Sequence, residues 1–225
     1  MRSTADLLRD ARLYVLLDGR DSCAGLAGLA QQLIDAGVDV LQLRDKQLPD
    51  RALLERARLL RELTAGTGTL FIVNDRPDLA VLSQADGVHV GQDELTVADC
   101  RAVAGATTLI GVSTHSPAQA RQAVADGADY IGCGPTFPSQ TKAFDEFPGL
   151  AFLRAVQAEI AIPAFAIGGI RGENLSRVLE TGFCRIAVSG AVTAAKEPAA
   201  AARSLRQLLD AGCGVAPGWP RRASD

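Results

Sequence analysis

The chain has 225 residues and a net charge of −3, with 48% hydrophobic and 22% charged residues. This length suits one large α/β domain or two small ones, and this charge excludes a basic field that would attract nucleic acid. No apolar run reaches the roughly 20 residues that span a bilayer, and aspartates interrupt the apolar N-terminal residues, which the core of a signal peptide does not tolerate. We therefore expect a cytoplasmic protein with no membrane partner and no nucleic-acid partner.

Eight short apolar segments alternate with amphipathic segments along the chain. The predicted strands cover residues 12–18, 40–44, 69–75, 87–91, 109–113, 130–135, 163–169 and 185–190. The predicted helices cover residues 24–36, 49–64, 77–84, 96–103, 116–126, 149–159, 173–181 and 198–211. The strands are almost continuously apolar, which is typical of parallel strands that are covered on both faces.

Eight such β-then-α units predict a single (β/α)8 TIM barrel, an α/β fold, which we place at residues 1–211. The alternative is a doubly wound open sheet, but that fold has a GxGxxG turn after its first strand, where this sequence has LLDGRDS. Residues 212–225 are rich in glycine and proline and predict a flexible C-terminal tail.

The five cysteines show no CxxC motif and no paired spacing. Isolated cysteines of this kind are typical of reduced thiols in a cytosolic protein. We expect free thiols at Cys23, Cys100, Cys133, Cys184 and Cys213.

Polar residues follow nearly every predicted strand, at the rim where barrel enzymes carry their active sites. Gln42, Arg44 and Lys46 alternate along one strand end, so they share one face. An Arg and a Lys on one face favour an anion such as phosphate. A solvated salt-bridge network with Asp45 and Asp50 explains them at least as well when this motif is taken alone.

Two strand ends carry carboxylates that suit a metal ion. Asn74 and Asp75 directly follow the third predicted strand. Asp75 either caps the helix that begins near Pro77 or acts as an oxygen ligand of Mg²⁺, which favours one or two carboxylates plus phosphate oxygens. The next strand end offers a second carboxylate, either Asp93 or Glu94.

Small and hydroxyl-bearing residues follow the last three strands. The loop GPTFPSQTK at 134–142 offers hydroxyls and a lysine to a phosphate, although an ordinary turn explains this loop better in isolation. Glycines in IGGI at 167–170 and VSGA at 188–191 follow strands seven and eight, where barrels often bind phosphate. We therefore expect two anion sites and one metal site, which two phosphate-bearing substrates would require.

The motifs QLRDK, ND, HVGQDE, GVSTH, GPTFPSQTK, IGGI and VSGA stand in the order in which the thiamine phosphate synthase family carries them. From about Leu13 to Ala211 the chain resembles this family. The resemblance implies a transferase of thiamine biosynthesis that joins hydroxymethylpyrimidine diphosphate to a thiazole phosphate, or to its carboxylated form, and releases pyrophosphate. In this family the pyrophosphate departs before the thiazole nitrogen attacks, so the enzyme supplies charge neutralisation, alignment and Mg²⁺.

The resemblance also implies roles for single residues. The pyrimidine diphosphate would be bound by Gln42, Leu43, Arg44, Asp45, Lys46, Asn74, Ser113 and Lys142. The catalytic candidates among them are Arg44, Lys46, Ser113 and Lys142. The thiazole phosphate would be bound by Ser139, Gln140, Thr141, Gly169, Ser189 and Gly190. The Mg²⁺ ligands would be Asp75 and Glu94, with Glu94 in the place of a more usual Asp and Gly190 in the place of a frequent Ser.

Other interpretations stay open beside the synthase. Asp93 is expected to face solvent or to cap the helix that starts near Thr96, and His89 to be a hydrogen-bonded structural residue. His115 suits a site position and a helix-start position equally. A related thiazole phosphate tautomerase would need only the thiazole half of the site. A non-catalytic, phosphate-binding regulatory barrel would lose the Mg²⁺ and diphosphate groups, whose presence favours the synthase. A homo-oligomer is compatible with the sequence.

Overall fold

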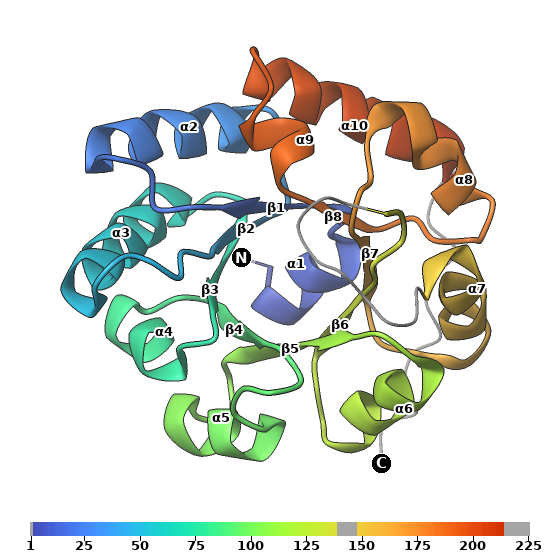
Figure 1. Cartoon of the computed structure of the whole chain (residues 1–225). Coiled ribbons are helices and arrows are strands. Elements are labelled where there is room, and N and C mark those ends of the chain that lie inside the picture. Colours follow the sequence, from blue (N-terminus) through green and yellow to red (C-terminus); the bar gives the residue numbers. More distant parts are fainter. Residues whose placement is uncertain (1, 139–147, 214–225) are drawn as a thin grey trace.

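Eight parallel strands close into a barrel in a computed structural model that describes residues 2–138 and 148–213. Each strand pairs with its neighbour in sequence, and β8 pairs with β1 to close the ring. All helices except the first one surround this ring (Figure 1). The predicted (β/α)8 barrel is therefore confirmed.

All eight predicted strands are present, and most end earlier than predicted. They are β1 (Leu13–Leu17), β2 (Val40–Leu43), β3 (Leu70–Asn74), β4 (Gly87–Val90), β5 (Leu109–Thr114), β6 (Tyr130–Cys133), β7 (Ala164–Ile167) and β8 (Ile186–Val188). The polar residues that follow them consequently lie in loops at the carboxyl ends of the strands rather than within the strands themselves.

The predicted helices are also present, with the seventh divided in two. They are α2 (Cys23–Asp35), α3 (Asp50–Thr64), α4 (Pro77–Ser83), α5 (Val97–Ala104), α6 (Pro117–Ala125), α7 (Gly149–Glu159), the 3₁₀ turn η1 (Gly172–Asn174) with α8 (Leu175–Leu179), and α10 (Pro198–Gly212). Within residues 2–138 and 148–213, none of the helices has the length and apolar character needed to cross a membrane.

Two further helices lie outside the predicted segments: α1 (Thr4–Asp10) and α9 (Gly190–Thr193). Neither belongs to the eight β-then-α units of the prediction, because α1 precedes β1 and α9 lies between β8 and α10. Figure 1 shows α1 in the middle of the ring of strands. There Leu8 belongs to the same buried cluster as Val40 and Leu70, the first residues of β2 and β3. The α1 helix therefore closes the amino-terminal end of the barrel, opposite the rim that carries the polar loops.

The barrel interior is filled by aromatic rings. Tyr14 and Tyr130 both meet the ring of Phe165 edge-on, with centroid distances of 5.3 and 5.9 Å. All three rings are buried. Gly111 on β5 provides the space for one of them, because a Cβ atom at this position would overlap the ring of Tyr130. This glycine is therefore needed for close packing inside the barrel.

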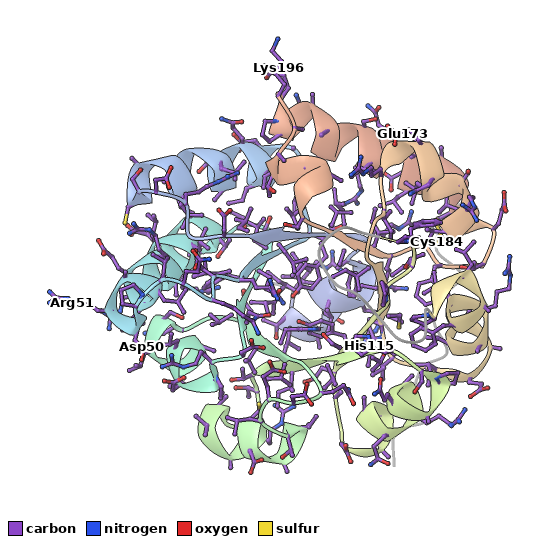
Figure 2. The ribbon with its side chains drawn as sticks, in the orientation of Figure 1. Asp50, Arg51, His115, Glu173, Cys184 and Lys196 are labelled. Carbon is purple, nitrogen blue, oxygen red and sulfur yellow. A yellow bond between two sulfur atoms is a disulfide. The ribbon has the colours of Figure 1, made fainter. Side chains whose placement is uncertain are left out.

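A disulfide joins Cys184 to Cys213, which shows that the expectation of five free thiols was wrong. The two residues are 29 positions apart, and their Cα atoms lie 5.7 Å apart, a separation that suits a disulfide. Figure 2 shows Cys184 on the side of the barrel that carries α7 and α8. The pairing depends on α10 folding back along α8, which the spacing of the cysteines does not reveal. Cys23, Cys100 and Cys133 are free as expected, and Cys133 is buried.

The role of Gly111 can be tested with a matched pair of glycine substitutions. Gly111→Ala should lower the free energy of unfolding by about 1–3 kcal/mol, because the added methyl group overpacks the interior against Tyr130. Gly28→Ala should raise it by about 0.5–1 kcal/mol, because Gly28 lies inside α2 with open space around it. Urea denaturation measures both changes. Equal effects of the two substitutions would contradict this account of the interior.

Candidate active site

A cavity of about 380 Å³ opens at the carboxyl ends of the strands. This size lies within the range of small-molecule sites, and the position is the one where barrel enzymes work. All eight strands or the loops that directly follow them contribute to its lining. The predicted site residues that line it are Gln42, Arg44, Asn74, Ser113 and Ser189.

The end of β2 runs from the barrel interior to the exposed rim. Gln42 is 2% exposed and lies inside the barrel, whereas Arg44 is exposed and lines the same cavity. Lys46 follows on the rim. The alternating residues thus offer a neutral amide to the base of the cavity and positive charges to its opening.

Lys46 connects the two predicted metal ligands. Its Nζ atom lies 3.4 Å from Asp75 Oδ2 and 3.6 Å from Glu94 Oε1. The loops after β2, β3 and β4 therefore bring two carboxylates around one positively charged atom. The Lys46 ammonium group thus occupies a position for a cation, and the carboxylate oxygens on either side of it are hard donors.

Two structural explanations from the sequence analysis do not hold: Asp75 as a helix cap, and Asp50 as a salt-bridge partner of Arg44 and Lys46. Asp75 does not cap α4, because the N-cap residue of this helix is Arg76 and no side chain caps it. Asp50 pairs with Arg76 at 2.6 Å and not with the residues of the β2 end. Asp75 also has a positive φ of 60°, which is uncommon for a residue other than glycine and is frequent at functional sites.

The adjacent acids Asp93 and Glu94 are separated by the structure. Glu94 folds back over Gly91, so closely that a Cβ atom on Gly91 would overlap its carboxylate. Asp93 is exposed and does not cap α5, because Thr96 caps this helix in a capping box with Asp99. Glu94 is the acid that approaches Lys46, and the solvent-facing interpretation of Asp93 is confirmed.

Two residues of the β2 segment have side chains that turn away from the cavity. Leu43 is 1% exposed and packs in the cluster between strands and helices. Asp45 accepts backbone hydrogen bonds from Gly19, Gln47 and Leu48, at 3.1, 2.8 and 3.0 Å. Burial alone would raise the pKa of Asp45, but these three backbone hydrogen bonds together lower it by more. The pKa of Asp45 therefore lies below its usual value. Both side chains hold the segment in place, so only their backbone could contact a ligand.

The loops after β7 and β8 form the glycine-rich side of the rim. Gly168 and Gly169 have φ angles of 100° and 65°, in the region that favours glycine. The backbone N–H of Phe137 donates to the Gly168 carbonyl at 3.0 Å, which holds the loop after β6 against them. Ser189 and Gly190 are exposed at the start of α9, and a Cβ atom on Gly190 would meet open space. A serine would therefore fit there as well.

Four predicted site residues lie outside the residues that the structure describes. They are Ser139, Gln140, Thr141 and Lys142. The first three are predicted thiazole phosphate ligands, and the last is a predicted diphosphate ligand. The structure accordingly places the pyrimidine and metal side of the predicted site more completely than the thiazole side.

A chain of hydrogen-bonded side chains crosses the base of the cavity. Gln42 Nε2 donates to the Tyr14 hydroxyl at 2.8 Å, and the hydroxyls of Tyr14 and Tyr130 lie 3.1 Å apart. Tyr130 Oη is 3.2 Å from His89 Nδ1, and His89 Nε2 is 2.9 Å from Ser113 Oγ. His89 is thus hydrogen-bonded on both ring nitrogens, as expected for a structural histidine, and it also contacts a predicted site residue.

The two histidines differ in their surroundings. Burial, reinforced by the charge of Arg44, lowers the pKa of His89 to about 4. His115 lines the cavity, and its Nδ1 lies 2.7 Å from the Gly134 carbonyl oxygen. Its backbone N–H donates to Gln119 Oε1 at the start of α6 (Figure 2). His115 therefore combines the two roles that the sequence left open, a site-lining position and a helix-start position.

Two cavity residues escaped the sequence reasoning. Tyr14 and Tyr130 both line the cavity, yet they lie in strands that read as plain apolar core. The available signal was the hydroxyl group, because a buried tyrosine hydroxyl normally needs a hydrogen-bond partner. Without the closed barrel, however, the sequence does not indicate that these two residues from β1 and β6 would meet.

The donor atoms at the rim fit a hard divalent cation. Magnesium is usually held by one or two carboxylates, with substrate phosphates and waters completing its shell. Asp75 and Glu94 supply two carboxylates around the Lys46 ammonium group. Across residues 2–138 and 148–213 there is no cluster of three or more His, Cys, Asp or Glu side chains that would hold a metal without further ligands. The residues therefore fit a cation whose remaining ligands come from a bound phosphate or from water.

The sequence profile of a family described as thiamine monophosphate synthase matches residues 13–192. The chain belongs to the thiamine monophosphate synthase family. The matched segment contains β1 to β8 and reaches into α9, so it includes every strand that contributes to the cavity.

Two relatives in this family share more than two fifths of the aligned sequence. A thiamine-phosphate synthase of Rhodopirellula baltica is 47% identical over 208 residues, which cover 90% of this chain and 56% of that protein. One of Chloroflexus aurantiacus is 45% identical over 202 residues, which cover 89% of this chain and 93% of that protein. The chain thus spans a little over half the length of some relatives and nearly the whole length of others.

Solved structures support the same family. Thiamine phosphate pyrophosphorylase from Pyrococcus furiosus superposes with a TM-score of 0.82 at 33% identity, covering 92% of this chain and 100% of that one. A 3-hexulose-6-phosphate synthase superposes with a TM-score of 0.66 at 20% identity, covering 87% of this chain and 98% of that one. The second likeness is one of fold alone.

The buried position of His89 predicts a loss of stability in acid. An unfolded histidine has a pKa near 6.5, whereas burial lowers that of His89 to about 4. Between these values the unfolded chain takes up a proton that the folded protein does not, so stability falls as the pH drops from 6.5 towards 4, by about 3 kcal/mol at most. Urea denaturation at several pH values measures this loss. A His89→Gln variant should lose less stability over the same window, and an equal loss would contradict the prediction.

Proposed function

We propose that this protein is a thiamine phosphate synthase, which joins hydroxymethylpyrimidine diphosphate to a thiazole phosphate and releases pyrophosphate. The observation that carries the proposal is the position of Lys46 Nζ, 3.4 Å from Asp75 and 3.6 Å from Glu94. A cation position between two carboxylates, beside Arg44 at the opening of the cavity, suits a metal-bound diphosphate. The names of the relatives support the same reaction.

The proposed reaction needs no protein nucleophile. In this family the bond between the pyrimidine methylene and the diphosphate breaks before the thiazole nitrogen attacks, so the main task is to stabilise negative charge on the leaving group. The contact between His89 and Ser113 does not form an activated nucleophile. The lowered pKa of His89 makes it a weak base, and its other nitrogen meets the hydroxyl of Tyr130 rather than a carboxylate.

The residues around the cavity divide the remaining tasks. Arg44 and Lys46 would bind the diphosphate, Arg44 through two parallel hydrogen bonds and Lys46 as a point charge. Asn74, Gln42 and Ser113 would orient the pyrimidine part. The glycine loops after β7 and β8 would bind the thiazole phosphate, which aligns its nitrogen with the methylene carbon.

Asp75 and Glu94 would hold Mg²⁺ at the rim. When bound, the ion adds positive charge next to the departing diphosphate. Lys46 would then leave the space between the two carboxylates and turn to the diphosphate oxygens. Its 58% exposed side chain and its modest contacts at 3.4 and 3.6 Å permit this movement.

The pyrimidine half of the rim weighs against the two alternatives. A thiazole phosphate tautomerase would need only the glycine loops, and a regulatory barrel would need no metal position. The contacts of Lys46 with Asp75 and Glu94, together with Arg44 in the cavity, serve neither of them. Purified protein with both substrates and Mg²⁺ should form thiamine phosphate and pyrophosphate in equal amounts. Binding or isomerisation of thiazole phosphate without thiamine phosphate formation would overturn the proposal.

The role of Arg44 can be separated from stability. Arg44→Ala should lower kcat by roughly 10²–10³, because a charge that stabilises the leaving group is lost. The midpoint of urea denaturation should stay unchanged, because the Arg44 side chain is exposed. Steady-state kinetics and denaturation on the same preparations measure both effects. A parallel loss of activity and stability would count against the site role of Arg44.

The choice between the adjacent acids gives a matched test of the metal site. Asp75→Asn and Glu94→Gln should each raise the Mg²⁺ concentration needed for half-maximal activity roughly 10–100-fold, because each removes one ligand. Asp93→Asn should change it less than about 2-fold, since Asp93 is exposed and lies outside the Lys46 contacts. If Asp93→Asn raises the Mg²⁺ requirement and Glu94→Gln does not, the assignment of the second ligand is wrong.

A further inference from the structure

The hydrogen-bond chain at the base of the cavity contains three residues that the proposed function does not use. Tyr14, Tyr130 and His89 connect the two ends of the chain, Gln42 and Ser113, which come from β2 and β5. A path of four contacts between two predicted ligand-binding residues fixes the position of both. It also fixes which of their atoms donate and which accept.

With the Gln42 amide donating to Tyr14, the hydrogens can be placed in one direction along the whole chain. The amide of Gln42 donates to Tyr14, so the Tyr14 hydroxyl hydrogen is left for Tyr130. The Tyr130 hydroxyl hydrogen is then left for Nδ1 of His89. A neutral imidazole has one N–H, which now lies on Nε2 and donates to Ser113 Oγ. Every hydrogen points from Gln42 towards Ser113, and the Ser113 hydroxyl hydrogen remains for an acceptor beyond the chain.

We propose that Tyr14, Tyr130 and His89 are positioning residues of the active site. Their one-way chain presents a fixed pair of ligand groups at the base of the cavity. One end offers an acceptor, Gln42 Oε1, and the other end offers a donor, the hydroxyl of Ser113. This proposal rests on the proposed function only for the identity of the ligand.

An unpartnered atom supports this assignment. Gln42 Oε1 is buried, and it has no hydrogen-bond partner among the residues that the structure describes. A buried acceptor without a donor is costly, so it indicates a group that a ligand satisfies. The matching ligand is a heterocycle with an N–H donor for Gln42 and a ring-nitrogen acceptor for Ser113. The pyrimidine ring of the proposed substrate belongs to this chemical class, whereas an isolated phosphate does not.

The packing of the interior keeps the chain neutral and in one arrangement. Both tyrosine rings pack edge-on against Phe165, and the ring of Tyr130 lies over Gly111 with no room for a side chain. Burial raises the pKa of both tyrosines, so their hydroxyls stay protonated. Burial together with the charge of Arg44 keeps His89 neutral at pH 7. None of the three side chains therefore carries a negative charge that would pair with the positive groups at the rim.

The tautomer of His89 reports the direction of the chain directly. The protein has two histidines, so selective ¹⁵N-histidine labelling gives NMR signals from two rings, which a His115→Gln variant assigns. We expect the wild-type protein at pH 7 to carry the His89 hydrogen on Nε2. A reversed chain, in which Ser113 donates to His89, would place it on Nδ1. The Nδ1–H form in the wild-type protein would overturn the proposal.

Two tyrosine variants break the chain at different points and keep the rings. Tyr130→Phe removes the donor to His89, so a population with the hydrogen on Nδ1 should appear. Tyr14→Phe leaves the contact between Tyr130 and His89 intact, so the Nε2–H form should persist. Both variants retain the ring packing, and thermal unfolding confirms that they fold. An unchanged His89 spectrum in Tyr130→Phe would contradict the role of Tyr130.

Substrate binding provides the second measurement. In Tyr130→Phe, calorimetry should show a roughly 10-fold weaker affinity for hydroxymethylpyrimidine diphosphate, because the ends of the chain lose their fixed orientation. The affinity for thiazole phosphate should change less than about 2-fold, because no residue of the glycine loops takes part in the hydrogen bonds of the chain. Equal losses for both ligands would indicate a merely structural role and overturn the proposal. If the proposed function were wrong, hydroxymethylpyrimidine diphosphate would not bind the wild-type protein, while the tautomer of His89 would still test the chain.

Discussion

The closure of the barrel through the parallel pairing of β8 with β1 is the constraint on which the rest of the structure depends. In this pairing Leu13, Tyr14 and Val15 lie opposite Ile186, Ala187 and Val188. Because all strands are parallel, their carboxyl ends must meet at one rim. Lys46, Asp75 and Glu94 follow the neighbouring strands β2, β3 and β4, and the parallel pairing of these strands brings their side chains together although they are distant in sequence. At the opposite end, α1 seals the interior with Leu8.

The cavity that results has a charged opening and a neutral base. Arg44 and the contacts of Lys46 with two carboxylates lie at the rim, where water screens charge and a metal ion can exchange its ligands. The base is a chain of amide, hydroxyl and imidazole groups, buried at Gln42, Tyr14 and Tyr130 and half-buried at His89 and Ser113, where an unpaired charge would be costly. This division suits a substrate with a diphosphate at one end and an uncharged ring at the other. It also suits a reaction whose main demand is the stabilisation of a departing anion.

The sequence predicted the barrel because nearly continuous apolar strands and amphipathic helices are local patterns. It predicted which polar residues lie at the rim, because residues that directly follow the strands must lie there. The choice of Glu94 over Asp93 came from the family resemblance. The Thr96 and Asp99 capping box was also readable from its spacing, and it would have excluded Asp93 as the cap of α5. The disulfide and the contact between Tyr14 and Tyr130 could not be predicted, because both depend on which distant elements lie side by side after closure. The helices α1 and α9 were missed because they lie outside the eight β-then-α units on which the prediction depended.

The central claim is that the rim binds a diphosphate together with a divalent cation held by Asp75 and Glu94. Its most direct test is the affinity of the wild-type protein for hydroxymethylpyrimidine diphosphate, measured by calorimetry with Mg²⁺ and again with a chelator in its place. The account predicts binding that is roughly 10-fold or more tighter with Mg²⁺, and a loss of this difference in Asp75→Asn. Equal affinity of the wild-type protein with and without Mg²⁺ would contradict the account.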